Sequence, residues 1–396
     1  MEPSFQPDPT ALAGGVTDSR VLSGVQDPST APAEHVLLHS SVARQGGRLP
    51  ATAVDEAVLF PLLQDAYSLG RWRSWRRTEK GSSNISWFVH TDAGQVVLRR
   101  SHNLKTVAGA RFEFALIEHL RGHGYPAPPI QRTRDGDIHV EVQGVLHMVM
   151  GLLPGCAYDP GDPAQLELAA RGLGRYHSIV SELSPAGEPH RSSGLASLGQ
   201  PGQENLYAAV NVVVPLLDLQ SAAELTEDAR YLGERMEQLH VGLGQRQEEL
   251  RSLVIHGSYG QSAVLVDGNK LTGVLDFDRS AHDLLPLDLA YALRSFCRET
   301  PIRPGGPSVN VDLGRAFLHH YRSQAPLADA DLAALPEVFQ AQRLIVVAKK
   351  CQNLLTKQAI VPRQSREALG FALLLQRECA RLRWITHNPF PVKEDA

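Results

Sequence analysis

Residues 254–278 read VIHGSYGQSAVLVDGNKLTGVLDFD, and this stretch carries the clearest signals for both the fold and the chemistry. Short apolar, β-branched runs flank a polar loop, which predicts three strands, at 253–256, 263–266 and 271–277. The polar loop begins at His256 and contains Ser258. Short strands that present polar loops are a common place for binding and catalysis.

The last of these strands ends in two acids, Asp276 and Asp278. Because side chains alternate along a strand, residues two apart point to the same side. Two adjacent carboxylates suit a hard cation such as Mg²⁺, which takes one or two carboxylates together with substrate phosphates. From these residues alone, a turn cap before Arg279 and Ser280 is an equally good interpretation.

Outward from this stretch, the carboxyl-terminal half is mostly helical. Apolar residues recur at spacings of three and four, which indicates amphipathic helices. The expected helices lie at 166–183, 222–243, 313–321, 335–355 and 365–384. No internal repeat is present in the sequence.

The amino-terminal part has a different pattern. A helix is expected over Glu56–Tyr67, and a second over Ala110–His123. Strands are expected in pairs, at 87–89 with 95–98 and at 138–142 with 146–150. The sequence Leu152-Leu153-Pro154-Gly155 interrupts both periodicities and indicates a connector. Strand, strand, helix, strand, strand predicts a small α+β unit ahead of the helical part.

Composition limits the function classes. The chain has 396 residues, a formal net charge of −4 and 43% hydrophobic residues, which is typical of a soluble globular protein. This charge argues against a nucleic-acid or basic membrane-binding surface, and no apolar run is long enough for a membrane span. The first ten residues do not resemble a signal peptide. The four cysteines lie far apart, which favours reduced, mostly buried thiols in a cytoplasmic protein.

Two further groups before the connector can carry chemistry. The turn Gly81-Ser82-Ser83-Asn84 precedes the first hairpin, and its backbone N–H groups can approach phosphate oxygens; an ordinary turn is the simpler interpretation. Arg99 ends a strand and Glu113 lies on the next helix. A cation held by a helix glutamate can position nucleotide phosphates, although a solvated ion pair would leave the same pattern.

The order of these features resembles the aminoglycoside phosphotransferase and choline kinase-like family of small-molecule kinases. Seven ordered matches from about Lys80 to Phe296 carry the resemblance. They are Gly81-Ser82-Ser83-Asn84, Val97-Leu98-Arg99, Glu113, Pro126-Ala127-Pro128, Met148 to Gly155, Leu173-Gly174-Arg175-Tyr176-His177, and the pair Gly273 to Asp278 with Pro286 to Ala290.

The resemblance implies an α+β, protein-kinase-like two-lobed fold with a small β-rich N-lobe and a larger, mostly helical C-lobe. The expected boundaries are a disordered extension at 1–50, a nucleotide-binding N-lobe at 55–151, a catalytic and substrate C-lobe at 152–388 and a tail at 389–396.

It also implies the cofactors and the roles of individual residues. ATP or GTP with Mg²⁺ would bind, and a small molecule of unspecified identity would accept phosphate. Nucleotide-binding positions are Gly81, Ser83, Asn84, Arg99, Glu113, Met148 and Met150. Asp276, with Asp278 less strongly, corresponds to the metal ligand, and His256 belongs to the catalytic loop.

The catalytic loop departs from the family pattern at two positions. The family has His-Gly-Asp, four residues, then Asn; here Ser258 stands at the aspartate position and Ala263 at the asparagine position. Serine is a poor base near neutral pH, and alanine has no ligand atom. The sequence therefore leaves three hypotheses open. The first is an active or residually active ATP-dependent kinase, and the second is a kinase-fold pseudoenzyme that binds a nucleotide, a ligand or a protein partner. The third is different group transfer, including peptide modification, on the same scaffold.

Overall fold

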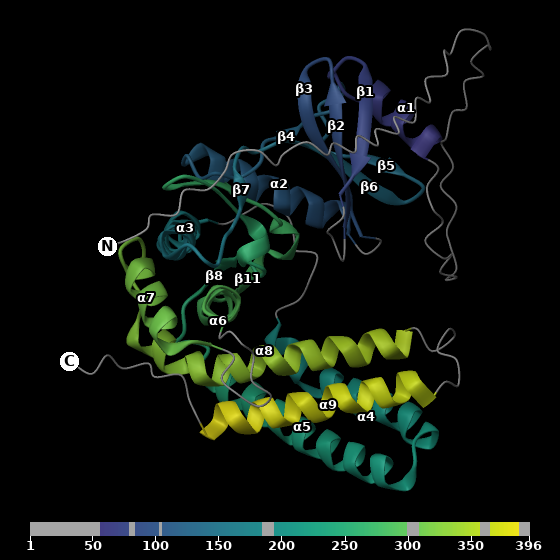
Figure 1. Ribbon diagram of the computed structural model, residues 1–396, viewed down its shortest axis with the longest axis vertical. Helices are drawn as coiled ribbons and strands as arrows, with labels where there is room; N and C mark the ends of the chain where they lie inside the picture. The colour runs from purple at the N-terminus through teal and green to yellow at the C-terminus, as the bar shows by residue number, and fades with distance from the viewer. Residues whose placement is uncertain are drawn as a thin grey trace, which may run out of the picture. The chain divides into compact units, whose positions relative to one another are not determined.

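The computed structural model describes residues 56–78, 84–102, 105–183, 194–298, 309–356 and 365–387. They form the expected two-lobed α+β fold, with an antiparallel sheet in the N-lobe and mostly helices in the C-lobe (Figure 1). The proposed extension at 1–50 and tail at 389–396 lie outside the described residues, so both stay predictions, as do the exact lobe boundaries.

The N-lobe is built on one antiparallel sheet with the strand order β1-β2-β3-β6-β4, and β5 pairs with β6. Its strands are β1 (Trp72–Arg77), β2 (Ile85–Thr91), β3 (Gly94–Arg100), β4 (Ile130–Gln131), β5 (Val140–Val142) and β6 (Val145–Gly151). The β2–β3 hairpin turns at Gly94, whose φ of 118° is open to glycine and strained for other residues. In this register Arg99 lies between Ser86 of β2 and Met148 of β6.

Helix α1 (Glu56–Ala66) packs Leu59, Phe60 and Leu63 into a small apolar core with residues of the sheet. Glu56 ties the start of this helix to the sheet, because its two carboxylate oxygens accept hydrogen bonds from the indoles of Trp75 and Trp87 at 3.0 and 2.8 Å.

Helix α2 (Val107–Gly122) starts where the Thr106 side chain accepts a hydrogen bond from the Gly109 backbone, an N-cap that satisfies one free donor. The helix buries Phe112, Leu116 and Leu120 in the main core, which is continuous with the core of the C-lobe. Its Glu113 is thereby carried into the interior beside β3.

The C-lobe holds seven α-helices among the described residues. They are α3 (Pro163–Val180), α4 (Gln200–Val213), α5 (Leu219–Gln245), α6 (Leu285–Phe296), α7 (Val311–Arg322), α8 (Asp329–Thr356) and α9 (Ser365–His387). Helices α4, α5, α8 and α9 lie side by side as a bundle (Figure 1), while α6 packs between α8 and the short strands.

Two small sheets carry the catalytic loop. One has the order β10-β9-β7, and the other pairs β11 with β8. Their strands are β7 (Cys156–Ala157), β8 (Ser252–Ile255), β9 (Val264–Asp267), β10 (Lys270–Val274) and β11 (Ala281–Leu284). The loop between β8 and β9 is therefore held at both ends by antiparallel partners.

The structure corrects one prediction about this region. The strand expected over 271–277 ends at Val274, and residues Phe277–Arg279 form a 3₁₀ turn. Asp276 is left-handed, with φ 71° and ψ 50°, so strand alternation does not explain how the two acids are placed. Strands β1, β4, β7 and β11 and helix α4 were also absent from the sequence prediction, as was α6 except through the family resemblance.

Among the described residues, no helix is both long enough and apolar enough to cross a bilayer. Three of the four cysteines, Cys297, Cys351 and Cys379, are buried free thiols, as predicted, whereas Cys156 is exposed.

Candidate active site

A buried ion cluster in the N-lobe contains the expected Arg99–Glu113 pair. The guanidinium of Arg99 donates to Glu113 Oε1 at 2.6 Å, and both side chains are buried. The other carboxylate oxygen of Glu113 accepts from Lys105 Nζ at 2.7 Å, also in the interior. Burial alone would raise the pKa of Glu113, but Arg99 and Lys105 together lower it, so the carboxylate is charged. Two cations share this one anion, and Asp278 lies close enough for Arg99 and Lys105 to lower its pKa as well.

Lys105 was not predicted. Its only signal was a cationic residue shortly before the predicted helix at Ala110–His123, and the distance to Glu113 depends on where the chain turns between β3 and α2. Helix geometry then places Glu113 within reach of both cations.

Asn84 joins the N-lobe to the acidic pair of the C-lobe. Its amide nitrogen donates to Asp278 Oδ2 at 3.0 Å, and its amide oxygen accepts from the His102 backbone at 3.0 Å. The predicted nucleotide-binding residue Asn84 is thus brought next to the predicted metal ligand Asp278. Gly81 and Ser83, from the same turn, lie outside the described residues.

The other two predicted nucleotide positions lie on β6. Met148 is fully buried, and its sulfur contacts Arg99 at 3.6 Å. Met150 is 8% exposed and pairs with Val97 of β3. Both therefore line the inner face of the sheet, and Met148 directly supports Arg99.

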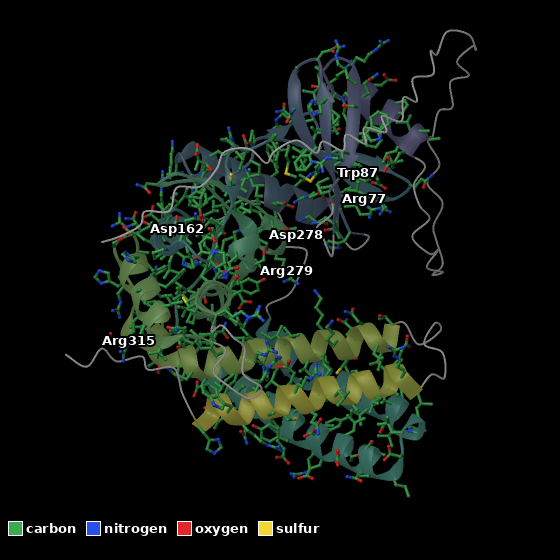
Figure 2. All side chains as sticks on the ribbon, viewed as in Figure 1. Arg77, Trp87, Asp162, Asp278, Arg279 and Arg315 are labelled. Atoms are coloured by element: carbon green, nitrogen blue, oxygen red, sulfur yellow. The ribbon has the colours of Figure 1, made fainter. Side chains whose placement is uncertain are left out.

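Asp276 and Asp278 lie within hydrogen-bonding reach of each other, and their pKa values diverge. Burial of the Asp276 carboxyl among neighbouring protein groups raises its pKa, and the negative charge of Asp278 raises it further. Burial also disfavours ionised Asp278, but Arg99, the bond from Asp276 and the Asn84 amide outweigh it and lower its pKa. Figure 2 shows Asp278 and Arg279 together at the 3₁₀ turn that follows β10.

This donor set fits a divalent cation. Two close carboxylates, one of them reluctant to ionise, gain from a positive charge between them, and Mg²⁺ prefers oxygen ligands. No group of three or more acidic, His or Cys side chains within the described part of the chain is arranged to hold a metal ion. Asp276 and Asp278 could therefore hold Mg²⁺ together with phosphate oxygens, whereas Ala263 has no ligand atom to offer.

Ser258, at the predicted catalytic position, is engaged with the protein itself. Its hydroxyl donates to the Asp276 backbone oxygen at 3.1 Å, and its Oγ lies 3.4 Å from His256 Nδ1. The side chain is 6% exposed. Ser258 thus connects the loop between β8 and β9 to the backbone at Asp276, and it has no basic atom for accepting a proton.

His256 is completely buried, and its Nε2 lies 3.1 Å from the Leu275 carbonyl. Burial lowers its pKa, only partly offset by Asp288. The ring is therefore neutral, and because a carbonyl can only accept, the proton sits on Nε2. His256 braces the loop against the strand that leads to Asp276.

Asp288, at the start of α6, holds the backbone of the loop between β8 and β9 through hydrogen bonds. Its carboxylate accepts from the backbone nitrogens of His256 and Gly257 at 2.7 and 2.9 Å. His177 of α3 contacts the same carboxylate at 3.1 Å through Nε2, and its Nδ1 meets the Tyr321 hydroxyl at 2.8 Å. Burial raises the pKa of Asp288, but these partners outweigh it and hold the pKa below its usual value. The sequence contained both residues within recognised motifs, yet neither was predicted as part of the site.

Comparison with known proteins identifies the same family. The family described as "Phosphotransferase enzyme family" (APH) matches residues 74–327. Among curated proteins, the homoserine kinase of Bradyrhizobium sp. (strain ORS 278) is 27% identical over 284 residues, covering 72% of this chain and 80% of that protein. The homoserine kinase of Nitrobacter winogradskyi is 26% identical over 273 residues, covering 68% and 76%.

Solved structures share the fold at low sequence identity. Amicoumacin kinase hAmiN, solved in complex with AMP-PNP, Ca²⁺ and Ami, has a TM-score of 0.61 at 16% identity, covering 85% of this chain and 96% of that chain. A microcompartment-associated aminopropanol kinase has a TM-score of 0.59 at 18% identity, covering 86% and 100%. Choline kinase from Cryptosporidium parvum has a TM-score of 0.53 at 12% identity, covering 84% and 96%.

Proposed function

Because this chain belongs to the phosphotransferase enzyme family, we propose that it binds Mg–ATP and a small hydroxyl-bearing molecule, with phosphate transfer between them slow or lost. One observation carries this proposal. Two residues proposed to bind nucleotide and metal lie together, with Asn84 bonded to Asp278, whereas the hydroxyl of Ser258, at the position of the family's aspartate, is bonded to the backbone.

Each side chain then has a role. Arg99 and Lys105, both held on Glu113, supply positive charge for nucleotide phosphates. Asp276 and Asp278 would hold Mg²⁺, which when bound neutralises phosphate charge. Asn84 fixes the orientation of Asp278. ATP is favoured by the neighbour solved with the analogue AMP-PNP.

The expected defect lies in the transfer step. A positioned general base contributes roughly 10²–10⁴-fold to rate, and Ser258 supplies none. Ala263, in addition, has no side-chain atom that could bind a second metal ion. Phosphoryl transfer depends mainly on positioning and charge neutralisation, so the scaffold keeps the means to bind even where turnover is lost. A purely nucleotide-binding, regulatory role is the second candidate, and the same two positions favour it.

The acceptor is proposed to be small. This chain matches 80% of the length of a curated relative named homoserine kinase. As the acceptor, this favours a hydroxy amino acid or a compound of similar size over a large antibiotic.

A double variant tests the proposal. ATP with Mg²⁺ should raise the melting temperature of the wild type, and Asp276→Ala should remove the Mg²⁺-dependent part of that shift. Ser258→Asp combined with Ala263→Asn should raise ATP turnover by roughly 10²-fold or more. Absence of any ATP stabilisation, with or without Mg²⁺, would contradict nucleotide binding. Fast wild-type turnover that collapses in Asp276→Ala would instead show an intact kinase.

A further inference from the structure

Arg294 on α6 is a partly buried cation with one donor left unpaired among the described residues. Its guanidinium carbon lies 5.0 Å from the centroid of the Tyr291 ring. Its Nε is buried and has no hydrogen-bond partner among the residues that the structure describes. Burial of a charged donor without a partner is costly, and such a group is ordinarily paired.

The acid whose charge acts on Arg294, Glu378, already has other partners. Glu378 of α9 accepts two bonds from the guanidinium of Arg343, one of them at 2.7 Å, and a further bond from Arg381 at 2.8 Å. Two arginines therefore share this one glutamate. No ion pair joins Arg294 to an acid within the described ranges, and Arg298 adds a further positive charge nearby.

Besides burial, neighbouring positive charges lower the pKa of Arg294, as expected for a cation beside other cations. Burial lowers its pKa most, and Arg343 lowers it further. The group of Arg294, Arg298, Arg343 and Arg381 with Glu378, called here the arginine cluster, therefore holds four cations and one acid; Arg343 and Glu378 are largely buried, whereas Arg298 is exposed and Arg381 partly exposed.

Helix α6, which carries Arg294, adjoins the loop between β8 and β9. The Gln261 backbone nitrogen donates to Ser295 Oγ at 3.1 Å. A Cβ at Gly260 would lie 2.6 Å from that oxygen and 3.3 Å from the Tyr291 ring, so loop and helix are in close contact. Residues three and four apart share a helix face, so Arg294 lies on the same side of α6 as Tyr291, whose ring lies beside Gly260 of the loop that carries Ser258, whereas Arg298 follows the end of the helix.

We infer that Arg294 binds the carboxylate of the small molecule held in the C-lobe, and that the ligand is a hydroxy acid, including hydroxy amino acids. This inference rests on the proposed function and narrows it to a substrate class. The planar guanidinium suits a carboxylate because it can form two parallel bonds to it. An aminoglycoside, as a polycation, would be repelled by the same cluster.

A phosphate group of the nucleotide has the same charge as a carboxylate, so the experiment separates the two. Binding is measured by calorimetry in the presence of AMP-PNP and Mg²⁺ for three matched pairs: L-homoserine with 3-aminopropan-1-ol, L-serine with ethanolamine, and L-threonine with 1-aminopropan-2-ol. Each amine lacks only the carboxylate of its acid.

At least one acid should bind about tenfold or more tightly than its amine, the ratio expected for one charge-assisted hydrogen bond. Arg294→Gln should abolish this preference and leave the affinity for AMP-PNP unchanged. Arg294→Lys, which keeps the charge and loses the planar fork, should keep part of it. Arg315→Gln is the matched control, because Arg315 is an exposed arginine on α7, well separated from Asp278 in Figure 2.

The inference is overturned if none of the acids binds better than its amine, or if the preference survives in Arg294→Gln. A loss of AMP-PNP affinity in Arg294→Gln without an effect on the acids would assign the residue to nucleotide phosphates and also overturn it. Nucleotide stabilisation of the wild type is read separately, so a failure of the proposed function is recognised independently. If Arg294→Gln does not fold, Arg294→Lys is measured instead. An acid preference that is unchanged in Arg294→Lys and does not weaken with rising salt would contradict charge recognition.

Discussion

The Asn84 amide and the Asp278 carboxylate, 194 residues apart in sequence, meet in a hydrogen bond of 3.0 Å. The same amide accepts from the His102 backbone, so its orientation is fixed from both sides. This bond joins Asn84, the residue just before β2 of the N-lobe, to the turn at Phe277–Arg279 in the C-lobe, so the position of Asp278 depends on where Asn84 lies.

Replacing Asn84 should weaken nucleotide binding. Asn84→Ala removes a hydrogen bond to a charged group, worth about 1.5–3 kcal/mol, and leaves Asp278 free to rotate away from the metal. The affinity for Mg–ATP measured by calorimetry should fall about tenfold or more. Asn211→Ala, an exposed asparagine on α4, should leave it unchanged. Equal affinities of the two variants would contradict this role.

The buried ion cluster makes Glu113 important for stability. Glu113→Gln leaves Arg99 and Lys105 buried without their shared anion, and breaking such a pair costs about 3–5 kcal/mol. Urea denaturation should show this loss of unfolding free energy. Glu118→Gln, on the exposed side of the same helix, should change it by no more than about 0.5 kcal/mol. A small effect of Glu113→Gln would mean that the two cations find other partners.

Gly257 is required by the backbone of the catalytic loop. Its φ is +75°, and a Cβ there would lie 2.4 Å from the Arg279 carbonyl oxygen. Gly257→Ala should therefore lower the unfolding free energy by about 2 kcal/mol or more. Gly242→Ala in α5, where no atom lies within 4 Å of the added carbon, should raise it by about 0.5–1 kcal/mol. Thermal unfolding of both variants checks the opposite signs.

His147 should make stability depend on pH. The ring is buried on β6, its Nδ1 lies 3.0 Å from the Val145 carbonyl, and its Nε2 has no partner among the described residues. Burial, together with Arg100, lowers its pKa to about 4. The unfolded chain, with an ordinary pKa near 6.5, binds more protons between these values, so stability should fall as pH falls from about 6.5 to 4.

The measurement for His147 is a difference between two proteins. His147→Leu removes this titration while other groups, including His256, are common to both. The unfolding free energy of the wild type relative to the variant should drop by up to about 3 kcal/mol over this pH interval. A difference that does not vary with pH would show that His147 titrates normally.

Several elements could be read from local sequence because their cause is local. Helices α2 and α5 follow the spacing of their apolar residues, and the β2–β3 hairpin follows from Gly94 between two β-rich runs. The replacements at Ser258 and Ala263 are also visible in sequence, since they are matters of residue identity. Short edge strands such as β1 and β11 were missed, because pairing with a distant strand decides whether such segments become strands at all.

The acidic pair shows where local reasoning failed. Alternation along a strand predicted that Asp276 and Asp278 lie close together, which is correct, but the reason was wrong. The strand ends at Val274, and Asp276 has a left-handed backbone conformation. The closeness of Asp276 and Asp278 comes from the turn after β10 and from the Asn84 bond across the lobes.

The sequence by itself determined the family, the two-lobed plan and the presence of Ser258 and Ala263 where the family pattern has aspartate and asparagine, because each depends on residue types in a fixed order. Only the tertiary structure decided which charges meet: Lys105 with Glu113, Asp288 with the His256 backbone, and Arg343 and Arg381 with Glu378, while Arg294 has no acid partner in the described part of the chain. Most of these contacts join elements that lie far apart in the chain. They depend on packing, because packing brings the elements together and determines which charges are buried and need a partner.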